Sequence, residues 1–182
     1  MKTMSKLAAS AFALSLAVAS AVALTASPAA AATNSCKVLK GTSTFHPPIP
    51  VKGSVSGYIT STGTVSGCTG TKPTGGSGTF TSKIKSSKPG SCATLVKGGN
   101  VLQGTAKTSW KNGKVTNMKI TVKTGTGTKY NIANITGTVS SGLFAGKHVT
   151  GQVKFTPKDK SMCISKPLTA VTFVNTKPFQ LV

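Results

Sequence analysis

The sequence predicts an all-β domain, first of all an antiparallel β-sandwich of about eight or nine strands, with a closed antiparallel β-barrel as the alternative. Three observations support this class. Segments rich in Thr and Val alternate between apolar and polar residues, turn residues separate them at hairpin-like intervals, and no helical periodicity follows the N-terminal segment. The sandwich comes first because 168–174 is apolar on both faces, which suits a central strand between two disulfide-bonded sheets.

The first 32 residues are predicted to be a signal peptide and not part of the fold. Lys2 and Lys6 give a basic start, an apolar run covers 7–24, and an Ala-rich segment with A-x-A cleavage sites follows. A membrane-spanning helix is the alternative, but the processing-type sequence after the apolar run disfavours it. We expect the mature chain, 33–182, to be one exported domain, either extracellular or associated with the cell wall.

The segment 101–124 is predicted to be a β-hairpin around the turn signal Asn112-Gly113. A three-residue loop pairs Ala106 with Met118 and requires a positive φ at Gly113. A two-residue loop would put lysine on the apolar face, so we choose the three-residue loop. The core face then consists of Leu102, Gly104, Ala106, Thr108, Thr116, Met118, Ile120 and Val122.

The other strands follow from the same alternation of apolar and polar residues. They are expected over 51–59, 79–85, 129–140, 149–156 and 168–174. A break in the alternation predicts a bulge near Ala133 and Asn134. The prolines within 42–50 predict a loop or an edge strand, and Pro178 predicts an edge after the last strand.

Four cysteines in an exported chain predict two disulfides, for which three connectivities exist. A weak internal repeat relates 45–55 to 144–153, and a cysteine follows each copy. If Cys68 and Cys163 are equivalent, each has its own partner. We therefore predict the pairs Cys36–Cys68 and Cys92–Cys163. Because the chain has no C-x-x-C pair and its histidines are far from any cysteine, we predict no metal site and no cofactor.

Charge is the strongest compositional signal. All 22 basic residues are lysine and Asp159 is the only acid, so removal of Lys2 and Lys6 leaves twenty lysines against one acid, or +19. Such a domain attracts polyanions, although lysines also keep a Thr-rich sheet protein from associating edge to edge. The lysines predicted on the polar side of strands, and therefore to bind polyanions, are Lys52, Lys83, Lys85, Lys107, Lys119, Lys123 and Lys154.

Catalysis is disfavoured by the residue types that the chain lacks. One Asp and no Glu cannot form the carboxylate pair of a glycosidase or a Mg²⁺ or Ca²⁺ site. His46 and His148 are the only imidazoles, and they lie in the two repeat copies, so they could face each other. No G-x-S-x-G, P-loop or dinucleotide motif occurs. The sequence therefore predicts a protein that is not an enzyme.

Two kinds of binding protein remain. The first is a secreted cationic module that associates with anionic envelope polymers or anionic lipid surfaces. Because arginine is absent and aromatic residues are few, no sequence-specific nucleic-acid partner is expected. The alternative is a small-ligand-binding or inhibitor scaffold. Trp110 with Tyr58 or Tyr130 could form a sugar platform, but a single Trp at the end of a hairpin favours a core position.

Several segments of the mature chain resemble a known group of proteins. They are GCTG at 67–70, SWKNGK at 109–114, GTVSSGLFAGKHVTGQVKF at 137–155, and PLTAVTF at 167–173 after Cys163. With the signal peptide, they resemble the small exported β-rich proteins of actinomycetes. The resemblance covers nearly all of the mature chain, but its motifs are strand and turn residues. It implies export and a disulfide-bonded β fold, and it transfers no catalytic residue.

Overall fold

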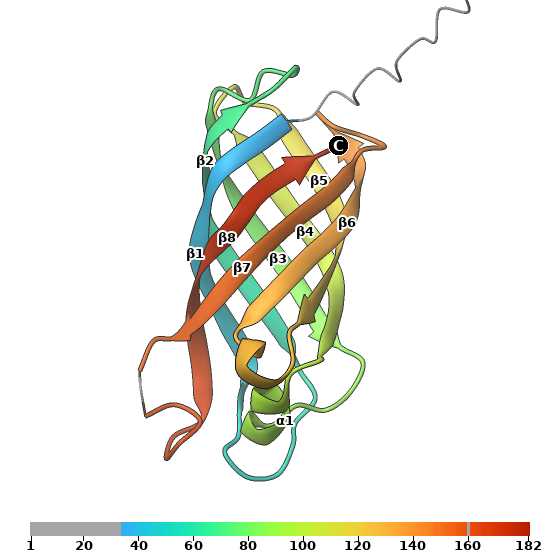
Figure 1. The fold of residues 1–182 in the computed structure, drawn as a ribbon. Coiled ribbons are helices and arrows are strands. Elements are labelled where there is room, and N and C mark those ends of the chain that lie inside the picture. Colours follow the sequence, from blue (N-terminus) through green and yellow to red (C-terminus); the bar gives the residue numbers. More distant parts are fainter. Residues whose placement is uncertain (1–33, 160) are drawn as a thin grey trace, which may run out of the picture. The chain divides into compact units, whose positions relative to one another are not determined.

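The computed structural model describes residues 34–159 and 161–182, so the predicted signal peptide lies outside the described residues. Eight strands form one antiparallel sheet in which each strand pairs with its sequence neighbours and β8 pairs back to β1, closing a barrel (Figure 1). The strands are β1 (Asn34–Ile49), β2 (Tyr58–Thr69), β3 (Ser77–Ser86), β4 (Val101–Trp110), β5 (Val115–Thr124), β6 (Ile132–Gly142), β7 (His148–Pro157) and β8 (Leu168–Leu181). The predicted all-β antiparallel class is confirmed, in the closed-barrel form given as the alternative.

The β4–β5 hairpin has the predicted register. Ala106 pairs with Met118. The Trp110 N–H donates to the Lys114 carbonyl at 2.8 Å, and the Gly113 N–H donates to the Trp110 carbonyl at 2.9 Å. Gly113 has a φ of 81°, the left-handed value that the three-residue loop requires. The loop length is therefore confirmed. The division of the hairpin into a core side and an exposed side that carries Lys107, Lys119 and Lys123 is confirmed as well.

β1 continues through the prolines that predicted a loop or an edge, so that prediction is wrong. Regular pairing with β2 ends at His46, and the register with β8 shifts between Thr44 and Ile49. Pro47 and Pro48 lie in this irregular stretch. A residue without an N–H is tolerated in a strand where the regular ladder is interrupted.

The second predicted strand begins later than expected. β2 starts at Tyr58, and 51–57 is a loop with one isolated bridge between Val55 and Gly90. The positive φ of Gly53 is incompatible with an extended strand, which explains the error. The repeat that related 45–55 to 144–153 therefore has no structural counterpart, because 149–153 lies within β7.

Two predictions on strand irregularity are also corrected. The bulge in β6 lies opposite Asn117 and Met118, which pair with Ser141 and Val139, and not near Ala133. β8, with strand neighbours on both sides, continues through Pro178 to Leu181, so Pro178 does not mark an edge. The β7–β8 register shifts on both sides of Gln152, and this distorted ladder accommodates the proline.

One end of the barrel is packed shut, and we call it the closed end. Trp110 and Phe144 meet edge to face with ring centroids 5.8 Å apart, and the Trp110 Nε1–H donates to Thr116 Oγ1 at 2.7 Å. Phe144 is 2% exposed. The disulfide Cys36–Cys68 joins β1 to β2 among these buried residues. Buried side chains therefore fill this end of the barrel.

The opposite end, the mouth, carries the short helix α1 (Cys92–Lys97) and the 3-10 turn η1 (Gly127–Lys129) (Figure 1). Ser91 caps α1 by accepting from the Thr94 N–H at 3.2 Å, and its own N–H donates to Thr94 Oγ1 at 2.8 Å. The helix was not predicted, because six residues are too few for a periodic pattern. Among the described residues, no helix is both long enough and apolar enough to cross a membrane.

The second disulfide, Cys92–Cys163, ties α1 to the β7–β8 loop at the mouth. Both predicted pairs are therefore confirmed, although the repeat that suggested them is not. Two disulfides are typical of proteins in an oxidising compartment.

Candidate ligand-binding cavity and lysine face

The barrel encloses a cavity of about 580 Å³ that residues from all eight strands line. This volume lies within the range of about 300–1,000 Å³ typical of small-molecule sites. The lining is mostly apolar. Ile59, Phe80, Leu102 and Phe155 belong to it and yet are only half-buried, because they border open space instead of packed side chains. The cavity is thus an unfilled part of the barrel interior.

Small side chains on adjacent strands explain why this space is left open. An eight-stranded barrel has an interior just wide enough for side chains to fill it or for one small ligand. Here the inward positions of the first four strands are occupied by several small residues. They are Gly41 and Ser43 on β1, Ser61 and Gly63 on β2, Ser82 on β3, and Gly104 and Ala106 on β4.

Two glycines let aromatic rings lie against the barrel wall. Gly41 and Gly63 are cross-strand partners. A Cβ at Gly41 would lie 2.7 Å from Cζ of Phe173, and a Cβ at Gly63 would lie 2.6 Å from Cε1 of Phe80. The two rings meet over this glycine pair with centroids 5.7 Å apart. Because the rings occupy the wall, the centre of the barrel stays free.

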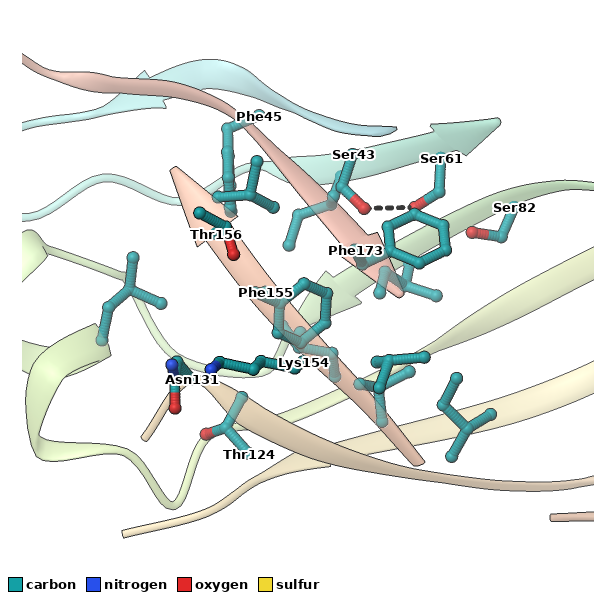
Figure 2. A pocket seen from close by; sticks show the side chains of 18 of the residues that line it. Ser43, Phe45, Ser61, Ser82, Thr124, Asn131, Lys154, Phe155, Thr156 and Phe173 are labelled. Atoms are coloured by element: carbon teal, nitrogen blue, oxygen red, sulfur yellow. Dashed lines mark hydrogen bonds between the residues drawn. The ribbon is translucent and has the colours of Figure 1, made fainter. Parts of the chain in front are cut away.

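Three serines form a polar row near the middle of this apolar wall. Ser43 pairs with Ser61 across β1 and β2, and Ser61 pairs with Ser82 across β2 and β3. Figure 2 shows the three side chains, with Ser43 and Ser61 joined by a hydrogen bond of 2.9 Å between their hydroxyl oxygens. We call Ser43, Ser61 and Ser82 the serine row.

The mouth has an exposed apolar rim. Val96 of α1, Tyr130 after η1 and Ile164 in the β7–β8 loop line the cavity and are 51%, 41% and 76% exposed. Asn131 and Lys154, drawn in Figure 2 with the cavity lining, add polar groups where β7 approaches the β5–β6 loop. Clustered exposed apolar residues with polar neighbours are typical of a site that meets a ligand or another surface.

Five of the seven predicted lysines lie together on the outer side of the barrel, and we call them the lysine face. They are Lys83, Lys85, Lys107, Lys119 and Lys123 of β3–β5. Lys83 and Lys119 both pair with Thr105 of β4. Lys107 follows Thr105 by two residues on the same strand, so it is a diagonal neighbour of both lysines. Diagonal neighbours in a sheet are about 7–8 Å apart, and the Debye length is about 8 Å at physiological salt. These charges therefore repel one another.

The other two predicted lysines are elsewhere. Lys52 lies in the β1–β2 loop, and Lys154 lies on β7 near the mouth. The only acid, Asp159, is in the β7–β8 loop, 3.7 Å from the ammonium of Lys166. No carboxylate side chain is thus left to neutralise the lysine face. Lys83 instead lies over the Tyr58 ring, 4.2 Å from its centroid.

The residues considered for catalysis do not come together. His46 is near the mouth end of β1, where its Nε2 lies 3.0 Å from Thr60 Oγ1, and His148 begins β7 at the closed end. Trp110 is buried, so it forms no sugar platform with Tyr58 or Tyr130. Within 34–159 and 161–182, no three His, Cys, Asp or Glu side chains are grouped as metal ligands would be.

The sequence did not predict the cavity, because the alternation along a strand shows which side chains face inward and not the volume that they leave empty. Of the three serines, only Ser82 falls within a predicted strand, on the same side as Phe80 and Ile84. Ser43 and Ser61 lie outside the predicted strands, so the alternation could not reveal the row. Comparison with protein-family models, with curated proteins and with solved structures found no match. The resemblance to exported β-rich proteins of actinomycetes therefore stays a prediction.

Proposed function

We propose that the protein is a non-catalytic binding protein that holds a small apolar molecule inside its barrel. The single observation that carries this proposal is the mostly apolar cavity of about 580 Å³. A barrel interior of this width is usually filled by packed side chains. When it is not filled, the lining residues lose dispersion contacts and the burial of their apolar surface. An apolar ligand restores both.

The expected affinity follows from the area that such a ligand can bury. At roughly 25 cal/mol per Å², a ligand that buries about 300 Å² of apolar surface gains roughly 7 kcal/mol. We therefore expect dissociation constants in the micromolar range or weaker, unless polar contacts add to this term. Binding would also raise the melting temperature, because only the folded barrel has the cavity.

The test uses N-phenyl-1-naphthylamine, an uncharged probe that fluoresces in apolar surroundings and is not attracted by lysines. Ala106→Phe would fill the cavity, whereas Thr105→Phe on the opposite face of β4 adds the same ring outside the barrel. We expect wild type and Thr105→Phe to bind the probe and Ala106→Phe to bind at least tenfold more weakly. No probe binding by the wild type, or equal loss in both folded variants, would contradict the proposal.

A second candidate function is association with an anionic surface outside the cell, with the protein secreted and extracellular or bound to the cell wall. The lysine face supports it, because natural surfaces usually intersperse acids among lysines unless a polyanion is to be held. The exposed rim of Val96, Tyr130 and Ile164 favours an anionic lipid surface over a purely polar envelope polymer. Binding would show little sequence preference for nucleic acid.

This candidate is tested by salt titration with vesicles of phosphatidylglycerol or phosphatidylcholine, a teichoic-type polymer, and DNA. The variant Lys83→Gln/Lys107→Gln/Lys119→Gln removes the centre of the lysine face. A matched triple variant removes three exposed lysines from other parts of the barrel, Lys37, Lys114 and Lys177. The salt slope is the slope of the logarithm of the binding constant against the logarithm of the salt concentration. We expect its magnitude to fall by up to about 3 in the first variant and by less in the second. Absence of binding at low salt to every anionic partner would leave the lysines a role in solubility only.

A further inference from the structure

We propose that the serine row recognises one uncharged oxygen, a hydroxyl or a carbonyl, on the apolar molecule in the cavity. This inference rests on the proposed function and assigns the chemical class of its ligand. It starts from an unusual placement, since three hydroxyls lie side by side on β1, β2 and β3 within an otherwise apolar stretch of wall.

The row is built into the barrel and is not a chance surface feature. Ser43 and Ser61 are 5% and 7% exposed, and their hydroxyl oxygens are 2.9 Å apart. Ser82 is the next cross-strand partner of Ser61. The sheet register fixes the spacing of all three, so no loop movement is needed to assemble the site (Figure 2).

The row has unused hydrogen-bonding capacity. Each serine hydroxyl has one donor hydrogen and two acceptor lone pairs. Only one hydrogen is used between Ser43 and Ser61, so the accepting hydroxyl can still donate, and both oxygens can still accept. Ser82 Oγ has no hydrogen-bond partner among the described residues, and it faces the cavity. Polar groups beside an apolar ligand are costly unless that ligand supplies a partner.

The surroundings favour an uncharged oxygen. Across β4 and β5 the same row continues with Ala106 and Met118, and on the other side Ser43 pairs with Val171 of β8, which also lines the cavity. Lys154 is the one charged side chain among the lining residues, and it is exposed, where β7 nears the mouth. A carboxylate at the serine row would be buried without a cation, which is unfavourable. A hydroxyl or carbonyl has no such penalty.

Discrimination should therefore depend on the oxygen and not on the hydrocarbon. Naphthalene and 2-naphthol form a suitable rigid pair because they differ by one oxygen. Both are measured by displacement of N-phenyl-1-naphthylamine from wild type, from Ser82→Ala, and from Ser43→Ala/Ser61→Ala. The double variant removes both partners of the buried hydrogen bond, so no hydroxyl is left without its partner. Ser109→Ala, on the exposed face of β4, is the matched control.

We expect the preference for 2-naphthol over naphthalene, taken as the ratio of their dissociation constants, to fall roughly tenfold in each serine-row variant. Naphthalene affinity should change less than twofold, and Ser109→Ala should match wild type. Parallel changes for both ligands, or an unchanged ratio in folded variants, would overturn the serine row as a recognition site while leaving cavity binding intact. If the wild type does not bind the probe at all, the proposed function fails and this inference fails with it.

Discussion

The two ends of the barrel are built differently although the same eight strands form both. At the closed end Trp110, Phe144 and Thr116 are buried and the connections are short, over 70–76, 111–114 and 143–147. At the mouth the connections cover 50–57, 87–100, 125–131 and 158–167, and apolar side chains remain exposed.

The two ends differ in how completely side chains fill the interior. At the closed end, large side chains fill the interior and the Cys36–Cys68 disulfide joins two neighbouring strands. At the mouth, Cys92–Cys163 joins two segments that are not strands, and Cys92 lies in a second, smaller buried cluster with Phe45, Ile49, Leu168 and Val171. We infer that packing at one end provides the stability that an unfilled interior at the other end lacks.

The largest expected effect compares two phenylalanines. Phe144→Ala removes a ring that is 2% exposed and should destabilise the fold by about 4 kcal/mol, as a large cavity does in a packed core. Phe155→Ala, which enlarges a space that already exists, should cost about 2 kcal/mol or less. Urea unfolding monitored by circular dichroism measures both. Equal losses would mean that the two ends are packed alike.

Removal of the mouth disulfide should have the next largest effect. Cys92→Ser/Cys163→Ser opens a crosslink between residues 71 apart in the sequence and should cost about 3 kcal/mol, within the usual range for a native disulfide. Hydrogen exchange should increase chiefly in α1 and the β7–β8 loop, with β4 and β5 still protected at the closed end. Uniformly faster exchange along the barrel would show that this bridge supports the whole fold.

A third comparison uses two alanines that face the interior. Ala133→Leu, at a residue with 0% exposure, should destabilise the protein by about 2 kcal/mol through overpacking. Ala106→Leu extends into the cavity and should change the free energy of unfolding by about 1 kcal/mol or less. Thermal unfolding of both variants checks this. A larger loss for Ala106→Leu would argue that the cavity is not accessible to side-chain atoms.

Glycines with positive φ allow a smaller comparison. A Cβ would meet nothing within 4 Å at either Gly113 or Gly53, whose φ values are 81° and 76°. Gly113→Ala should cost about 1 kcal/mol, because the tight hairpin cannot change its backbone. Gly53→Ala, in the longer β1–β2 loop, should cost about half as much. Denaturant midpoints at constant m-value measure the difference, and a larger effect at Gly53 would reverse it.

The smallest expected effect is at Asp159 in the mouth loop. The Ser161 N–H donates to Asp159 Oδ1 at 2.9 Å, and this hydrogen bond holds the pKa of the carboxyl below its ordinary value, with Lys166 adding to the effect. Because the folded pKa lies below the unfolded one, the stabilisation is present above the unfolded pKa and is lost as pH falls through the folded pKa. Asp159→Asn should therefore be slightly less stable than wild type at neutral pH and equal to it in strong acid. A difference that grows as pH falls would contradict this sign.

The sequence by itself determined which side of most strands faces inward. Because side chains alternate along a strand, the pattern from Leu102 to Val122 specified the register of the hairpin and the exposure of Lys107 and Lys119. It also specified an all-β chain, and it led to the correct disulfides through a repeat that the structure does not contain. The pattern predicted the wrong strand ends at 42–57. There the effect of a proline or glycine on a strand depends on the pairing of the neighbouring strands.

Only the tertiary structure decided that the sheet closes and that its interior stays open. Closure depends on the pairing of β1 with β8, in which Asn34 and Leu181, at opposite ends of the described chain, are partners. The alternation of residues within a strand carries no information about such distant pairing. The same long-range register brings Ser43, Ser61 and Ser82 into one row and collects five lysines on β3–β5. Inward and outward faces are local properties of a strand, whereas the volume between the strands is a property of the closed barrel.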